Sequence, residues 1–207
     1  MFTNSSVSSL DLSFLNTSSV KTMSGMFSES SVTSLDLSWF DTSSVTDMSD
    51  MFYSAYGLTS LDLSWFNTSS VSNMSHMFNN MELESLDVSW FNTSSVTDMR
   101  HMFGSSKIKS LDLSGFNVSL VRNMIGMFAF TTNLTNLNLS NWNSSLIENI
   151  DVMFLFTPNL IEINATNSVY GEAISMNNIF ELSDPNLVIR DKVGGKNFMN
   201  TGVITVP

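Results

Sequence analysis

The chain repeats a pattern of residues every 25 to 26 positions, and this period restricts the folds that are open to it. One column of the repeat is an apolar-polar-apolar triplet with Asp or Asn in the middle, and a second column is a Met-Phe pair. The triplets are Leu10-Asp11-Leu12, Leu35-Asp36-Leu37, Leu61-Asp62-Leu63, Leu86-Asp87-Val88, Leu111-Asp112-Leu113 and Leu137-Asn138-Leu139, with a divergent copy at Ile163-Asn164-Ala165. Both columns keep the same spacing, so residues 1–180 are predicted to form one array of about seven turns, the first of them incomplete.

Each unit contains two apolar clusters, LxxLDLSxF and VxxMxxMF. In the first cluster, Leu61 and Leu63 alternate with polar residues, which is typical of a short half-buried strand. The spacing of three in the second cluster predicts a bent short strand or a helical turn. One unit cannot bury both clusters alone. The predicted fold class is therefore a repeat solenoid, a leucine-rich-repeat-like right-handed coil with short parallel β-strands in each turn.

The two ends of the array have different sequence patterns. Met1 and Phe2 fall in the Met-Phe column, so the chain reads as a cut through an array. We expect further repeats upstream in the parent protein, and fraying or end-to-end self-association at this edge. From residue 181 the period is lost, and residues 181–207 are predicted to form a degenerate C-terminal cap.

The charge balance argues against several partners. Eight basic and nineteen acidic residues give a formal net charge of -11, and no basic stripe is present to follow a phosphate backbone. Nucleic acid is therefore not an expected partner. The sequence has no run of about 18 apolar residues and no secretory signal, so membrane insertion by this segment is not expected.

The unit LTSLDLSWFNTSSVSNMSHMF resembles the 25-residue repeat of bacterial and mycoplasma surface proteins grouped with the BspA-like leucine-rich repeats, whose consensus carries LDLSxFxTSxVTxMxxMF. The resemblance covers nearly the whole chain. It implies a leucine-rich-repeat-like solenoid at a cell surface or outside the cell, often lipid-anchored or wall-anchored, acting in adhesion or host interaction. The chain departs from the family in showing no signal, lipobox cysteine or sorting motif, so a cytoplasmic or viral product stays an alternative.

Two polar columns are predicted to be structural ladders. Five carboxylates stack in the first, and like charges about 5 Å apart repel, so hydrogen bonds from backbone N–H groups and neighbouring serines are expected to compensate them. Asn replaces Asp in later turns, which favours this interpretation over a Ca²⁺ site. The first column comprises Asp11, Asp36, Asp62, Asp87 and Asp112. The second column is expected to bond the backbone of the bend and to pair with its copies between turns, and it comprises Asn16, Asp41, Asn67, Asn92, Asn117 and Asn143.

No catalytic, cofactor or metal site is predicted. His76 and His101 occupy equivalent positions in adjacent turns, but no third ligand is placed beside them. No nucleophile elbow and no HExxH motif is present. The chain is therefore not expected to be an enzyme or to need a cofactor.

A third column supplies the candidate interaction surface. Trp39, Trp65 and Trp90 precede the apolar residue that ends the first cluster, and Gly115 and Asn141 take the same position in later turns, so the column is predicted to be partly exposed. An exposed aromatic row suits a protein or glycan ligand, although packing along the array is an alternative. Tyr53 and Tyr56, in a variable segment after a Met-Phe pair, complete the candidate surface.

The preferred function is a noncatalytic module that binds a protein or glycan through one face of the solenoid. Two alternatives remain. The first is a structural spacer or assembly rod without a specific ligand. The second is a polysaccharide-acting enzyme that uses column carboxylates.

Overall fold

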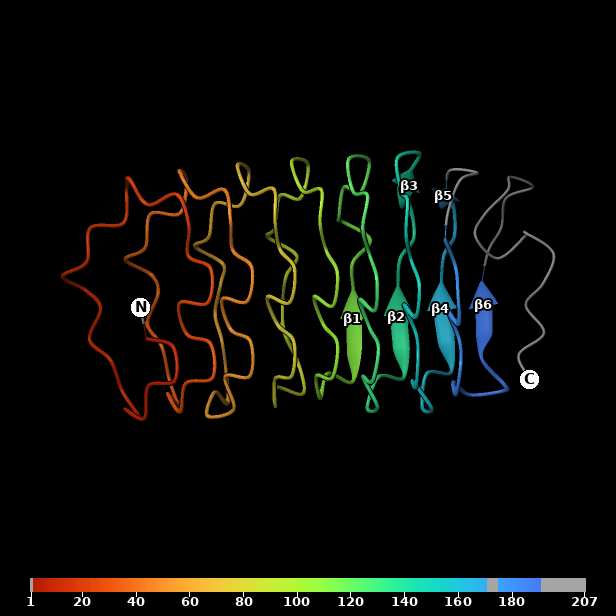
Figure 1. Ribbon diagram of the computed structural model, residues 1–207, viewed down its shortest axis with the longest axis horizontal. Helices are drawn as coiled ribbons and strands as arrows, with labels where there is room; N and C mark the ends of the chain where they lie inside the picture. The colour runs from red at the N-terminus through yellow and green to blue at the C-terminus, as the bar shows by residue number, and fades with distance from the viewer. Residues whose placement is uncertain (1, 171–174, 191–207) are drawn as a thin grey trace.

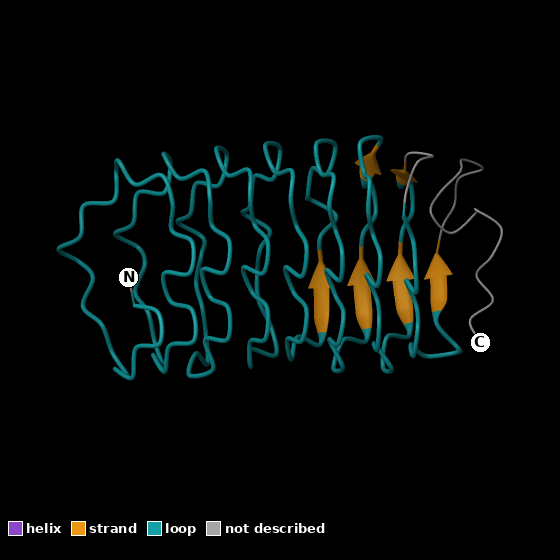
Figure 2. Ribbon diagram, in the orientation of Figure 1, coloured by secondary structure: helices purple, strands orange, loops and turns teal. Residues whose placement is uncertain are grey.

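The computed structural model describes residues 2–170 and 175–190 (Figure 1). Its regular elements are six short strands, and the described residues contain no helix (Figure 2). The strands are β1 (Ser110–Asp112), β2 (Asn136–Asn138), β3 (Asn143–Ser144), β4 (Glu162–Asn164), β5 (Val169–Tyr170) and β6 (Val188–Arg190). Met1 and residues 191–207, which hold part of the predicted opening pair and most of the predicted cap, lie outside the described residues.

Successive repeats lie side by side along the longest axis of the molecule (Figure 1). Strands β1, β2, β4 and β6 form one parallel sheet in that order, and its register places Leu111 beside Leu137 and Ile163 beside Ile189. Strands β3 and β5 form a second parallel pair. Isolated parallel bridges join equivalent residues of earlier repeats, as Thr22 joins Asp47. The predicted parallel pairing is confirmed, and the fold is compatible with a β-rich repeat protein.

Regular strands do not occur in every turn, which differs from the expectation. In the described residues they begin at Ser110, and the earlier copies of the triplet form no regular strand. In β1, β2 and β4 the strand accompanies deeper burial: the first apolar residue of the triplet is buried at Leu111, Leu137 and Ile163. The same position is only half buried at Leu61 and Leu86. Strand β6 also extends the sheet register past residue 180, where the sequence pattern ends the array.

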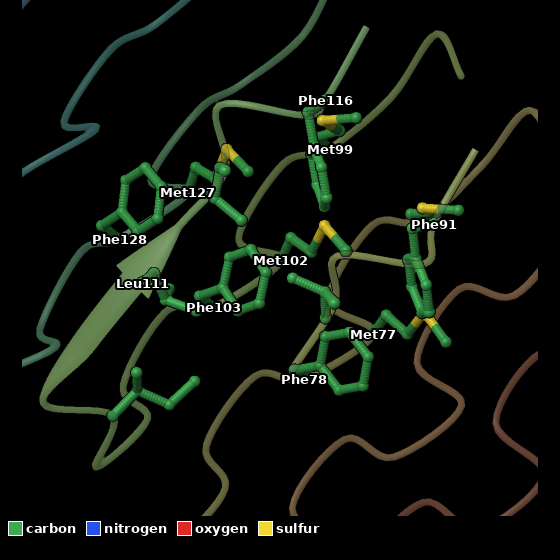
Figure 3. Packing of buried hydrophobic residues seen from close by; sticks show 14 of the residues in the cluster. Met77, Phe78, Phe91, Met99, Met102, Phe103, Leu111, Phe116, Met127 and Phe128 are labelled. Atoms are coloured by element: carbon green, nitrogen blue, oxygen red, sulfur yellow. The ribbon is translucent and has the colours of Figure 1, made fainter. Parts of the chain in front are cut away.

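The phenylalanines of the Met-Phe pairs, together with Phe180 after Ile179, form a continuous stack. Consecutive ring centroids lie 5.1 to 5.9 Å apart, and the ring planes differ by 3° to 16°. Figure 3 shows Phe78, Phe103 and Phe128 in this stack, with the paired methionines beside them. The stack comprises Phe2, Phe27, Phe52, Phe78, Phe103, Phe128, Phe154 and Phe180.

The chain around each Met-Phe pair forms turns that contain left-handed residues. One such residue directly precedes the Met, with φ between 51° and 62°, and another lies two residues after the Phe, with φ between 53° and 61°. Between them, alternate backbone N–H groups donate to carbonyls of the next repeat, as Phe27 N–H does to the Met51 carbonyl at 2.9 Å. Each repeat of the array is called a coil below. A left-handed conformation costs a non-glycine residue about 1–2 kcal/mol. The bonds between coils offset this cost, and the segment is neither a strand nor a helical turn.

Buried threonines form a second set of links between coils. The Thr68 hydroxyl donates to the Asn92 carbonyl at 3.0 Å and accepts from the Asn92 N–H at 2.8 Å. Each hydroxyl therefore satisfies both backbone polar groups of one residue in the next coil. The same pair of bonds recurs from Thr17, Thr42, Thr68 and Thr93, all of which are buried.

Replacing Gly57 with Ala is expected to lower the free energy of unfolding by about 1–3 kcal/mol, as overpacking does elsewhere. A Cβ at Gly57 would lie 2.5 Å from the Val32 carbonyl oxygen and 2.6 Å from the Ser31 carbonyl oxygen. Both are backbone atoms and cannot move aside cheaply. Urea unfolding measures the effect, with Gly115→Ala as the matched control, because a Cβ at Gly115 meets nothing within 4 Å. Equal stabilities of the two variants would contradict the predicted contact between coils.

Candidate interaction surface

A tight turn after each triplet places an aromatic ring outside the core. In the second coil, the Phe40 N–H donates to the Leu37 carbonyl at 3.0 Å and closes a four-residue turn. Leu37 and Phe40 are buried, whereas the intervening Trp39 points away and is 65% exposed. The same turn recurs at Leu12, Leu63 and Val88. The local backbone therefore fixes which of the two adjacent aromatic positions enters the core.

Four exposed rings in successive coils make up the aromatic row. Their exposed fractions range from 64% to 76%, so the predicted exposure of this column is confirmed. None of the tryptophans takes part in a ring-to-ring contact within the described residues, so the row is not a stacked ladder like that of the core phenylalanines. The aromatic row comprises Phe14, Trp39, Trp65 and Trp90.

The carboxylate row lies three positions before the aromatic row in the first four coils, and its fifth member precedes Gly115. Each carboxylate accepts a hydrogen bond from the backbone N–H of the serine two residues later, at 2.9 to 3.0 Å. These bonds, together with those from the serine hydroxyls, lower the pKa of each carboxyl and favour the charged form. The carboxylate row comprises Asp11, Asp36, Asp62, Asp87 and Asp112.

The asparagine column also bonds within its own coil. Asn67 Oδ1 accepts from the Ser69 N–H at 3.1 Å and from the Ser69 hydroxyl at 2.7 Å, and Asn92 bonds Ser94 in the same way. Asn117 accepts from the Ser119 N–H at 3.0 Å. These bonds confirm the expected contact with the backbone of the bend. The expected pairing between copies differs, because the adjacent threonines make the bonds between coils.

The two tyrosines lie in another part of the repeat. The Tyr53 ring packs edge-on against His76, with ring centroids 6.4 Å apart. The Tyr56 hydroxyl accepts a bond from Asn80 Nδ2 at 2.9 Å, and its side chain is exposed. Within the described residues, neither ring contacts the aromatic row. The structure therefore gathers the tryptophans into one row and leaves the tyrosines apart from them.

His76 and His101 form a stacked pair, with ring centroids 4.8 Å apart. Burial is the main cause that lowers the pKa of both imidazoles, and the pKa of His101 is lowered further by the charge that His76 carries when protonated. Arg100 also lowers both pKa values, whereas Asp98 raises them, as Asp50 does for His76. No cluster of three or more metal-ligating His, Cys, Asp or Glu side chains occurs in the described residues.

The pair predicts a loss of stability in weak acid. A lowered pKa in the folded protein means that the unfolded chain, with a histidine pKa near 6.5, binds protons first. The contribution of the pair is therefore complete above pH 6.5 and is lost as the pH falls through the folded pKa values. Thermal unfolding between pH 7.5 and 5.5 measures this slope. The slope should be shallower in His76→Asn/His101→Asn, because the two titrating side chains are removed. Asn suits both positions, since Asn178 adopts the same left-handed conformation at the equivalent position. An unchanged slope would contradict the prediction.

Comparison with known proteins identifies one family. The family model described as "Mycoplasma protein of unknown function, DUF285" matches residues 1–107 and 79–186. Neither the curated proteins nor the solved structures contain a match to the chain. A helix with the length and apolarity of a membrane span is absent from the part of the chain that the structure describes.

Proposed function

The chain belongs to this Mycoplasma family of unknown function, and from that premise we propose that it is a noncatalytic interaction module that binds a protein or glycan ligand through one face. The proposal includes the finer fold, a leucine-rich-repeat-like right-handed solenoid with the BspA-like repeat, and a place at the cell surface, where its role is adhesion. The observation that carries it is the aromatic row, with three tryptophans 64% to 65% exposed in adjacent coils.

Physical reasoning supports a binding role for this row. Exposure of the apolar area of an indole ring to water is unfavourable. A row of exposed apolar side chains on one face is therefore typical of an interaction site. Tryptophan offers a large rigid ring that loses little conformational entropy on binding and is frequent among the residues that dominate binding energies. The core does not need these rings, because Gly115 and Asn141 occupy the equivalent positions in later coils.

The first experiment screens the chain and a Trp39→Ser/Trp65→Ser/Trp90→Ser variant against arrays of glycans and of extracellular proteins. The proposal expects a selective ligand for the parent chain and a loss of that ligand in the variant. Circular dichroism and thermal unfolding check that the variant keeps the fold. A chain that binds no ligand, or a variant that binds equally well, would sink the proposal.

Light scattering separates this function from a spacer or assembly rod. An interaction module should stay monomeric as its concentration rises, whereas an assembly rod should grow in mass. Growth in mass without a selective ligand would favour the rod.

A further inference from the structure

We propose that the aromatic row docks an extended, arginine-rich segment of a partner protein. This inference rests on the proposed function and names the class of ligand. It combines two features that lie three residues apart in the first four coils, an exposed aromatic ring and a carboxylate.

The exposed rings offer faces to a cation. Trp39, Trp65 and Trp90 make no ring-to-ring contact within the described residues, so their faces are not covered by one another. A guanidinium stacks on an indole face through both cation–π attraction and planar contact, and Trp is the best side chain for this contact. The aromatic row places one ring in each of four successive coils along the array. This spacing suits a ligand that runs along the array and presents several side chains.

The carboxylate row supplies the complementary charge. In the described residues, none of its five members forms a salt bridge with Lys or Arg. Four basic residues on other parts of the surface pair instead with other acids, namely Arg100 with Asp98, Lys109 with Glu84, Arg122 with Glu148 and Arg190 with Glu162. Each carboxylate of the row accepts its serine bond at Oδ1, and Asp36 also accepts a hydrogen bond from the side chain of Trp39. A row of like charges without cations beside it favours a cationic partner.

The geometry of the two rows favours arginine over lysine. The guanidinium is planar, so one face can lie on an indole while its edge donates to a carboxylate. A lysine ammonium is a compact, strongly hydrated point charge and cannot make both contacts with the same geometry. The net charge of -11 strengthens the attraction of any basic segment at long range, and the aromatic row adds a short-range contact to this attraction.

The test uses fluorescein-labelled oligoarginine and oligolysine peptides of equal length, with binding measured by fluorescence anisotropy. Two triple variants divide the surface, Trp39→Ser/Trp65→Ser/Trp90→Ser and Asp36→Asn/Asp62→Asn/Asp87→Asn. The Asn variant should keep the turns, because Asn138 and Asn164 natively accept the same backbone bond at 3.1 Å.

A matched control removes three charges elsewhere. Glu29→Gln/Glu82→Gln/Glu181→Gln changes the net charge by the same amount at exposed positions in the segments around and after the Met-Phe pairs. We expect the parent chain to bind oligoarginine more tightly than oligolysine. Each of the two row variants should bind oligoarginine at least about tenfold more weakly, from the summed cation–π and charge contacts, and the control should change binding less than about twofold.

Three results would overturn the inference: no binding of oligoarginine, equal binding by the tryptophan variant, or equal weakening by the Glu control. Selective capture of a neutral glycan that is lost in the tryptophan variant would overturn this inference while supporting the proposed function. A failure of both the peptide and the array experiments would instead remove the function itself.

Discussion

Replacing Phe103 with Ala is expected to lower the free energy of unfolding by about 3–5 kcal/mol, the range typical of a buried aromatic truncated to Ala. Phe103 is fully buried and stacks on Phe78 at 5.7 Å and on Phe128 at 5.9 Å. The substitution removes the buried apolar surface of the ring and both stacking contacts. It also leaves a cavity, because hydrogen bonds hold the neighbouring coils in place and prevent them from closing it. Urea unfolding followed by circular dichroism measures the loss.

Two controls separate the core stack from aromatic content in general. Phe103→Leu keeps most of the side-chain volume and should cost clearly less than Phe103→Ala. Trp90→Ala removes a larger ring from the aromatic row and should change stability by less than about 1 kcal/mol, since that ring is 64% exposed. If Trp90→Ala destabilised the protein as much as Phe103→Ala, the assignment of the two columns to surface and core would be wrong.

Replacing Thr68 with Val is expected to cost about 2–4 kcal/mol, because an unsatisfied buried polar group costs about 1–3 kcal/mol. Valine matches the shape of threonine but cannot accept from the Asn92 N–H or donate to the Asn92 carbonyl. The substitution therefore leaves both backbone groups without their partner while keeping the apolar packing. Thermal and urea unfolding measure the change.

The matched variants isolate the hydroxyl. Thr68→Ser keeps both bonds and loses one methyl, which corresponds to about 0.8 kcal/mol of burial. Thr46→Val removes an exposed hydroxyl that makes a single bond of 3.2 Å to the Lys21 carbonyl, and it should be nearly neutral. Equal stability of Thr68→Val and Thr68→Ser would show that the hydroxyl is not what joins the coils.

The period of the sequence predicts the main features of the fold. Residues one period apart, such as Leu111 and Leu137, pair in parallel because each unit must bury the same apolar positions against its neighbours. The sequence reveals the left-handed residues only in part. Gly25 and Asn178 favour this conformation, but Val152, Phe130 and Leu182 adopt φ between 51° and 61° although β-branched and bulky residues disfavour it. At those three positions bonds between coils impose the conformation, and no local propensity signals it.

The exposure of the tryptophan column is also predictable from the sequence. Gly115 and Asn141 in the tryptophan column indicate an exposed position, and the structure gives Trp39, Trp65 and Trp90 that exposure. The sequence favours the column of Asn16, Asp41, Asn67 and Asn92 as the link between coils, whereas the structure has that link at the threonine that follows each of them. The threonine hydroxyl both donates and accepts at a single oxygen, as a link to one residue of the next coil requires, whereas an asparagine donates and accepts at two separate atoms.

Acrylamide quenching of tryptophan fluorescence tests most directly whether the aromatic row is a binding surface. Three of the four tryptophans lie in the row, whereas Trp142 is fully buried and donates its indole N–H to the Leu113 carbonyl at 2.8 Å. The free protein should show one readily quenched population and one protected population. Addition of a ligand found in the array, or of oligoarginine, should protect the readily quenched population. Rings that are already shielded in the free protein, or that stay fully quenchable while a ligand is bound, would contradict the account.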